Sequence, residues 1–180
     1  MSKTRIAVVS GGFDPLHSGH INLLESAAGY GDKLVVLLNS DEWLTRKKGR
    51  PFMPFEERAG IIERLDMVDY VYGVDDTDGS VNKGLENVKK AFTGVADDVE
   101  FIFCHGGDRG KDNIPEMEVE GYTFEFSVGG DNKANSSSWI LKEWQYPTER
   151  RVWGEFSNLF EDGVVKAVSY THLRAHETSH

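Results

Sequence analysis

The stretch RIAVVSGGFDPLHSGH, residues 5–20, decides the fold, because it joins a short apolar run to a glycine-rich turn and the start of a helix. The run at 5–10 predicts a buried β-strand, since it is short and rich in β-branched residues. Residues 20–31 carry apolar side chains at helical spacing, and Gly29 and Gly31 predict the end of that helix. A strand, a turn and a helix in this order indicate a unit of a parallel α/β protein.

Outward from this unit, strands and helices continue to alternate. Apolar runs predict further strands at 33–39, 69–74, 99–104 and 121–128, and helical spacing predicts helices at 54–65, 81–92 and 136–144. We therefore predict a Rossmann-like, doubly wound α/β fold, with a mainly parallel five-stranded sheet and helices on both faces. Ligands of such folds bind beyond the carboxyl ends of the strands. The loops expected there are 11–20, 39–50, 105–113 and 129–138.

The composition narrows the function classes. The chain has 180 residues, 39% of them hydrophobic, and a formal net charge of −10, which suits a globular protein and disfavours nucleic-acid binding. Its single cysteine, Cys104, lies in the apolar run VEFIFC and is expected to be a buried thiol in a reducing compartment. The longest strongly apolar run, LVVLL, is far too short to span a membrane. We expect a cytoplasmic protein with neither nucleic acid nor membrane as partner.

The turn after the first strand has the chemistry of an anion site. Free N–H groups and the positive end of the helix dipole face this turn. Gly11 and Gly12 are expected to let a phosphate or nucleotide approach the backbone, and Gly19 to leave space for a flat ring or a sugar. Asp14 is expected to accept hydrogen bonds from the turn's own N–H groups.

Two histidines stand three residues apart in the same turn. At this spacing His17 and His20 lie on one side of a first helical turn, where both imidazoles can donate to one phosphate as charge develops on it. A zinc site is the alternative, but it needs a third and a fourth ligand, and His105 is the only other histidine before the tail. The glycines do not fit G-x-G-x-x-G, and no G-K-[ST] follows them.

The segment GGFDPLHSGH resembles the signature G-x-F-D-x-x-H-x-G-H of the cytidylyltransferase-like nucleotidyltransferase superfamily, and the resemblance extends from about Arg5 to about Trp144. It implies an enzyme in which His17 and His20 are catalytic. The residues implied to bind the nucleotide in this segment are Gly11, Gly12, Phe13, Asp14 and Gly19.

The resemblance also gives roles to three other loops. Lys47 or Lys48, with Arg58, is implied to bind the triphosphate, and the choice between the two lysines stays open. Gly107 and Asp108 are implied to lie beside the ribose or base of the nucleotide. The hydroxyl run that the family places on the β- and γ-phosphates is matched by Ser136, Ser137 and Ser138.

Within the superfamily, the features NSD after the second strand, KG before RP, and GGD after the fourth strand resemble the heptose-1-phosphate adenylyltransferase branch. The cytidylyltransferase branch has an arginine where this chain has Asp131, which weakens CTP as the substrate, and Trp139 stands where a small or polar residue is usual. ATP and a sugar phosphate are therefore favoured. Two alternatives stay open: a CTP-dependent enzyme acting on glycerol-3-phosphate or a similar alcohol phosphate, and a non-catalytic nucleotide-binding module.

The reaction implied by the resemblance is an in-line attack of the acceptor's phosphate on the α-phosphorus of the nucleotide, with pyrophosphate as the leaving group. Mg²⁺ is expected to arrive with the triphosphate, and we assign no metal ligand to the protein. The expected partners are a nucleoside triphosphate and a phosphorylated small molecule, and a homodimer is left open.

The C-terminal end has a different character. We expect a nucleotidyltransferase domain at residues 1–146 and an extension at 147–180. The segment RRVWGEFSNLFEDGVVKAV resembles the opening of the cupin domain of mannose-6-phosphate isomerase-type proteins. From Ser169 the chain becomes polar and contains His172, His176 and His180, and we expect a disordered, non-native tail there.

Overall fold

The protein is described by a computed structural model covering residues 3–94, 98–106, 114–130, 136–145, 148–151, 154–161 and 166–172. The chain divides into two compact units, Met1–Ser137 and Ser138–His180. In the first unit the elements are β1 (Thr4–Gly11), α1 (Ser18–Ala28), β2 (Lys33–Leu38), α2 (Asp41–Lys48), α3 (Phe55–Ile62), β3 (Tyr70–Gly73), α4 (Asn82–Thr93), β4 (Val99–Cys104), the 3-10 helix η1 (Pro115–Glu118) and β5 (Tyr122–Glu125).

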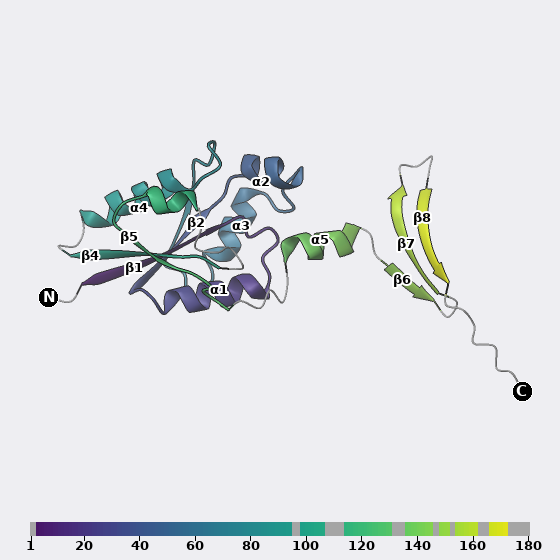
Figure 1. The fold of residues 1–180 in the computed structure, drawn as a ribbon, viewed down its shortest axis with the longest axis horizontal. Coiled ribbons are helices and arrows are strands. Elements are labelled where there is room, and N and C mark those ends of the chain that lie inside the picture. The colour runs from purple at the N-terminus through teal and green to yellow at the C-terminus, as the bar shows by residue number, and fades with distance from the viewer. Residues whose placement is uncertain are drawn as a thin grey trace, which may run out of the picture. The chain divides into compact units, whose positions relative to one another are not determined.

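The five strands form one sheet in the order β3-β2-β1-β4-β5, and every pair is parallel (Figure 1). The predicted Rossmann-like α/β fold with a five-stranded parallel sheet is therefore confirmed. Because β2 and β4 lie on opposite sides of β1, the strand order reverses at the carboxyl end of β1. The glycine-rich turn that leads to His17 and His20 follows β1, so it lies at this switch point.

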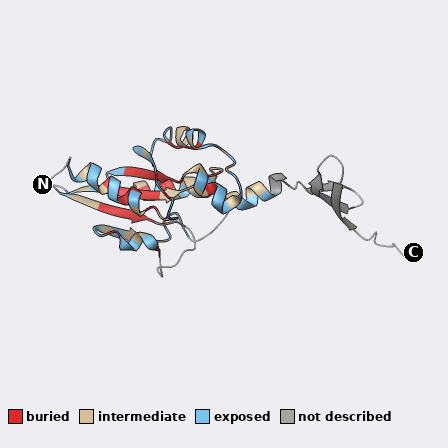
Figure 2. Ribbon diagram, turned by 90° about the horizontal axis from the view of Figure 1, so that it is seen from above, coloured by how far each residue is buried: buried red, intermediate tan, exposed pale blue. Residues whose placement is uncertain are grey.

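Alternate residues of each central strand enter two separate cores. Ala7 and Val9 of β1 pack in one core together with α1 and α3, whereas Ile6 and Val8 pack in the other together with α4. Helices therefore cover both faces, and the central strands β1, β2 and β4 are the most buried part of the first unit (Figure 2). This two-sided burial explains why the strands read as continuous apolar runs rather than as alternating patterns. Cys104 is 2% exposed, so the prediction of a buried thiol is confirmed.

Helix α2 was missed, because residues 39–50 were expected to form a loop. Its apolar content is low, and Leu44 is its one buried residue, so no apolar periodicity marks it. Its ends carry the signal instead. Ser40 caps the N-terminus, acidic residues fill the first turn, basic residues fill the last turn, and Gly49 follows at φ 90°.

The second unit contains most of α5 (Ser137–Gln145) and a three-stranded antiparallel sheet in the order β6-β7-β8. Its strands are β6 (Thr148–Arg151), β7 (Gly154–Glu161) and β8 (Lys166–His172). The units divide after Ser137, within α5, whereas the sequence suggested a boundary after residue 146. Strand β8 continues to His172, so the tail expected to be disordered from Ser169 begins within a strand. His176 and His180 lie outside the described residues, and the cupin resemblance stays a prediction.

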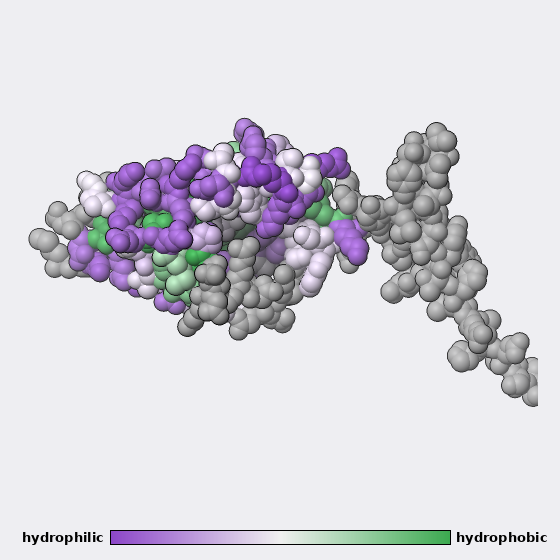
Figure 3. All heavy atoms as spheres, turned by 45° about the horizontal axis from the view of Figure 1, so that its top comes forward, coloured by the Kyte–Doolittle hydropathy of each residue, from purple (hydrophilic) through white to green (hydrophobic). Residues whose placement is uncertain are grey.

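The surface of the first unit is mostly hydrophilic on the face seen in Figure 3. Within the described part of the chain, no helix is both long enough and apolar enough to cross a membrane.

Candidate active site

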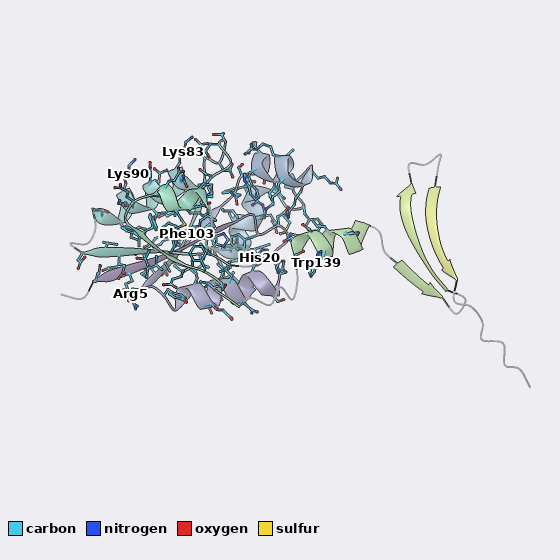
Figure 4. The ribbon with its side chains drawn as sticks, viewed as in Figure 1. Arg5, His20, Lys83, Lys90, Phe103 and Trp139 are labelled. Carbon is cyan, nitrogen blue, oxygen red and sulfur yellow. The ribbon has the colours of Figure 1, made fainter. Side chains whose placement is uncertain are left out.

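The candidate site is the junction between β1 and α1, together with the segments that pack against it. This junction, residues 11–20, contains His17 and His20 and is named the histidine turn. Figure 4 shows His20 and Arg5 at opposite ends of the β1–α1 unit, with His20 at the carboxyl edge of the sheet. The first N–H groups of α1 are used within the turn itself, since that of Gly19 donates to Nδ1 of His17 and those of His20 and Ile21 donate to the carbonyl of His17. This differs from the free N–H groups that the sequence suggested.

His17 is the N-cap of α1. Its Nδ1 accepts a hydrogen bond of 3.1 Å from the N–H of Gly19, which leaves Nε2 as the nitrogen that carries the ring proton. A Cβ on Gly19 would lie 3.0 Å from Cε1 and 3.1 Å from Nδ1 of His17. The bareness of Gly19 therefore makes room for the imidazole of His17. The expectation that Gly19 also leaves space for a substrate ring or sugar stays a prediction.

His20 lies against His17, and the two rings stack with their centroids 3.8 Å apart. The ring of Phe13 meets His20 edge-on at 4.9 Å. Burial, then the neighbouring His17 and Lys48, lowers the pKa of His20 to about 3. Burial, then Lys48, also lowers the pKa of His17. Both imidazoles are therefore neutral at pH 7, so they act as hydrogen-bond donors rather than as cations.

Gly11, Gly12 and Phe13 serve the packing of the turn itself. A Cβ on Gly12 would lie 2.8 Å from Cδ2 of Leu44, and one on Gly11 would lie 3.1 Å from the ring of Phe13. A side chain at either glycine would therefore crowd the protein's own residues, and the close approach of a nucleotide to their backbone stays a prediction. Phe13 is 2% exposed and belongs to the core under α1, so its side chain supports His20 from below rather than facing a ligand.

Asp14 is 1% exposed and fixes a second segment to the turn. Its carboxylate accepts hydrogen bonds of 2.8 Å from the N–H groups of Phe52 and Met53. We expected the donors to come from its own turn, but they come from the segment between α2 and α3. The distant segment provides the donors because two successive N–H groups can each bond to one oxygen of the buried carboxylate.

The two candidate lysines differ sharply in position. The Nζ of Lys48 donates to the carbonyl of Asp14, and burial is the main cause that lowers its pKa, with Arg58 also lowering it and Asp14 opposing. Lys47 is exposed, with its Nζ 4.3 Å from the centre of the Trp43 ring. The structure therefore brings Lys48, not Lys47, to the histidine turn.

Arg58 differs from the expectation of a triphosphate ligand, because its side chain is 0% exposed. Its Nη1 donates to the carbonyls of Gly12 and Asn39 at 2.8 and 3.0 Å, and its Nε donates to Met53 at 3.1 Å. Its Nη2 forms an ion pair with Asp41. In this arrangement Arg58 joins the ends of β1 and β2 to the start of α3 through charge-assisted hydrogen bonds to backbone carbonyls.

The remaining predicted residues are only partly described. The Oγ of Ser137 donates to the carbonyl of Pro15 at 3.0 Å, which ties the start of α5 to the histidine turn. Ser136 is half-buried, and Ser138 is exposed and belongs to the second unit. Gly107 and Asp108 lie outside the described residues. Their neighbour His105 has its backbone N–H on the carbonyl of Glu125 and its carbonyl on the N–H of Val128, which closes the ends of β4 and β5.

Asp76 and Ser40 were not predicted as site residues. Asp76 is 2% exposed and accepts hydrogen bonds from Asn39 and Ser40 at the end of β2. A signal existed in the sequence, since an aspartate that follows an apolar strand faces the same edge as the other functional loops.

The arrangement provides neutral imidazole N–H donors and the ammonium of Lys48 around a single turn, at the positive end of the α1 dipole. These groups suit an anion whose charge grows during reaction. Both oxygens of Asp14 are already satisfied, and no group of three or more His, Cys, Asp or Glu among the described residues is placed to hold a metal ion.

Comparison with known proteins places this geometry in a family. The model of the cytidylyltransferase-like family matches residues 8–141. Among curated proteins, the bifunctional protein HldE of Alcanivorax borkumensis is 35% identical over 132 residues, covering 72% of this chain and 24% of that protein. HldE of Pseudomonas syringae pv. syringae is 32% identical over 144 residues, covering 78% of this chain and 28% of that protein. The chain thus spans about a quarter of the length of these relatives.

Solved structures agree on the fold. The lipopolysaccharide core biosynthesis protein of Thermoplasma volcanium is 26% identical, with a TM-score of 0.52 over 69% of this chain and 94% of that chain. A putative nicotinate-nucleotide adenylyltransferase of Vibrio parahaemolyticus has a TM-score of 0.50 over 78% of this chain and 86% of that chain, and at 17% identity it supports the fold alone. The family match covers well over half of the chain and contains the histidine turn, so this protein belongs to the cytidylyltransferase-like family of nucleotidyltransferases.

Proposed function

We propose that this enzyme transfers AMP from ATP to a sugar phosphate and releases pyrophosphate. The observation that carries the proposal is the stacked pair of neutral imidazoles at the N-terminus of α1, with the ammonium of Lys48 beside it. A sugar phosphate is supported by the sequence features that resemble the heptose-1-phosphate adenylyltransferase branch. The name of the Thermoplasma volcanium relative, a lipopolysaccharide core biosynthesis protein, also favours a sugar substrate.

In the proposed reaction, an oxygen of the acceptor phosphate forms a bond to the α-phosphorus of ATP. The bond from that phosphorus to the oxygen bridging to the β-phosphate breaks, and the electron pair leaves with pyrophosphate. The acceptor phosphate is already ionised, so no general base is needed. Nε2–H of His17 and an N–H of His20 donate to the α-phosphoryl oxygens as their charge grows, and Lys48 binds the leaving phosphates, near the positive end of the α1 dipole.

Mg²⁺ belongs to the substrate in this proposal, as part of the Mg²⁺–ATP complex. The carboxylate nearest to the histidines in sequence, Asp14, is buried, and each of its oxygens accepts a backbone hydrogen bond from the segment between α2 and α3, so we assign it a structural role. Mg²⁺ is known to bind through phosphate oxygens and waters with few protein ligands. We also propose that the enzyme works in the cytoplasm, where its one buried thiol would stay reduced.

The test is pyrophosphate release with Mg²⁺, each of ATP, CTP, GTP and UTP, and a panel of sugar 1-phosphates, glycerol-3-phosphate and other alcohol phosphates. The proposal expects turnover with ATP and a sugar 1-phosphate. Turnover with CTP alone would replace it by the alcohol-phosphate alternative. Nucleotide binding without turnover across the whole panel would replace it by the non-catalytic module.

A further inference from the structure

Asp76 is a buried carboxylate that the proposed reaction does not use. It follows β3 and is 2% exposed. Its Oδ2 accepts from Asn39 Nδ2 at 3.0 Å and from the N–H of Ser40 at 2.9 Å, and its Oδ1 accepts from Ser40 Oγ at 2.6 Å. A buried charge with three donors is costly to assemble and rigid once assembled. The positions of its hydrogen-bond partners show which element of the fold Asp76 fixes.

The partners of Asp76 lie at both ends of α2. Ser40 is the N-cap of this helix, and its Oγ accepts from the N–H of Trp43 at 3.0 Å. Because the hydroxyl hydrogen of Ser40 points to Asp76, its lone pair is directed at the helix. In the last turn, Nη2 of Arg46 donates to the carbonyl of Asp76 at 2.7 Å and lies 3.8 Å from its Oδ1. One residue therefore fixes the start and the end of α2.

Leu44 and Lys48 of α2 face the histidine turn. Leu44 is fully buried, and a Cβ added to Gly12 would lie 2.8 Å from Cδ2 of Leu44. Lys48, the last residue of the helix, donates to the carbonyl of Asp14. Since α2 is a short rigid rod, any rotation of it about its axis would carry the ammonium of Lys48 away from the turn.

We propose that Asp76 is a positioning residue for nucleotidyl transfer, which fixes α2 at both ends and thereby places the ammonium of Lys48. The inference rests on the proposed function, in which Lys48 binds the leaving phosphates. The neighbouring Asp75 provides the contrast. Its side chain is 55% exposed and pairs with Lys83 and Thr77, and it makes no hydrogen bond to α2 among the described residues.

The decisive variant is Asp76→Asn, because it keeps the volume of the side chain and places an NH₂ group against donors. We expect kcat/KM for pyrophosphate release to fall about 10²-fold, as a displacement of about 1 Å in a catalytic group does. Asp75→Asn is the matched control and is expected to stay within about twofold of wild type. Arg46→Ala removes only the contacts that the exposed Arg46 side chain makes with Asp76. It keeps the buried hydrogen bonds, so it tests the proposal even if Asp76→Asn does not fold, with an expected loss of about 10-fold.

A double-mutant cycle shows whether Asp76 acts through Lys48. In a Lys48→Ala background, Asp76→Asn is expected to cost little more, because the group that it positions is already gone. If the two losses multiply instead, Asp76 acts independently of Lys48, and the proposal is overturned.

A measurement without turnover separates this inference from the proposed function. Hydrogen–deuterium exchange over residues 41–48 is expected to become at least about tenfold faster in Asp76→Asn and Arg46→Ala, with α1 unchanged. Unchanged exchange in α2 overturns the proposal whatever the activities are. If wild type releases no pyrophosphate from any substrate, the proposed function fails, but the exchange data still decide whether Asp76 holds α2.

Discussion

The imidazole rings of His17 and His20 stack with their centroids 3.8 Å apart and their planes inclined by 23°. Two cations do not stack at this distance in a partly buried site, so the pair is stable while both rings are neutral. The lowered pKa values of both histidines agree with this. The two neutral rings can therefore donate hydrogen bonds, and these hydrogen bonds become stronger only when a neighbouring phosphoryl group gains negative charge.

Replacing His17 by asparagine separates its two roles. Asparagine is among the best N-cap residues, so His17→Asn keeps an acceptor for the N–H of Gly19 while it removes the Nε2 donor. We expect the rate of pyrophosphate release to fall about 10²–10³-fold. The free energy of unfolding should stay within about 0.5 kcal/mol of wild type, whereas His17→Ala should also lose about 1 kcal/mol of capping. Full activity of His17→Asn would remove His17 from the mechanism.

The pH dependence of stability tests the burial of His20. Its pKa is about 3 in the folded protein and 6.5 in the unfolded chain, so between these values the unfolded chain binds more protons. The free energy of unfolding should therefore fall as pH falls from 6.5 towards 3, by at most about 1.4 kcal/mol per pH unit from this residue. In His20→Gln this part should disappear. Urea unfolding at pH 7, 6 and 5 measures it as the difference between the two proteins, and equal pH profiles would contradict it.

Sequence predicted the sheet well because each central strand is buried on both faces, which gives runs such as IAVV and LVVLL a single interpretation. It predicted the histidine turn because the family signature consists of fixed residue types at fixed spacing. The sequence was less informative about residues whose role depends on side chains that are close in space but distant in sequence. For Gly12 and Gly19 the sequence suggested only space for a ligand, whereas a Cβ at these positions would also crowd Leu44 and the ring of His17. No sequence pattern tells a glycine that admits a substrate from one that admits another side chain.

Lys47 and Lys48 form a matched pair within one helix. Lys48 contacts the histidine turn, whereas Lys47 lies over Trp43 and is exposed. We expect Lys48→Ala to lower kcat/KM about 10²-fold, because it removes a cation from the leaving phosphates. Lys47→Ala should change kcat/KM less than about threefold. Initial rates of pyrophosphate release measure both, and the reverse order would show that α2 turns when nucleotide binds.

Arg58 should behave as a structural residue. Arg58→Met leaves Asp41 and the carbonyls of Gly12 and Asn39 without their buried donor. We expect a loss of about 3 kcal/mol in the free energy of unfolding, at the lower end for a broken buried pair because Asp41 keeps access to water. Arg64→Met, a change of an exposed arginine, is the control and should cost less than about 0.5 kcal/mol. Unchanged stability with a raised KM for the nucleotide would instead make Arg58 the triphosphate ligand that the sequence suggested.

Gly19→Ala tests whether the space above this residue belongs to His17. The added Cβ would lie 3.0 Å from Cε1 of His17, so the ring must shift by a few tenths of an ångström relative to His20, on which it stacks. Because alanine favours a helix more than glycine does, by about 1 kcal/mol, stability should hold or rise slightly while the rate of pyrophosphate release falls about 10-fold. Gly94→Ala, at the C-cap of α4 with no atom within 4 Å of the new Cβ, is the matched control and should leave the rate unchanged. A fully active Gly19→Ala enzyme would mean that catalysis does not depend on the stacked geometry, since the fold would be intact and only the ring of His17 displaced.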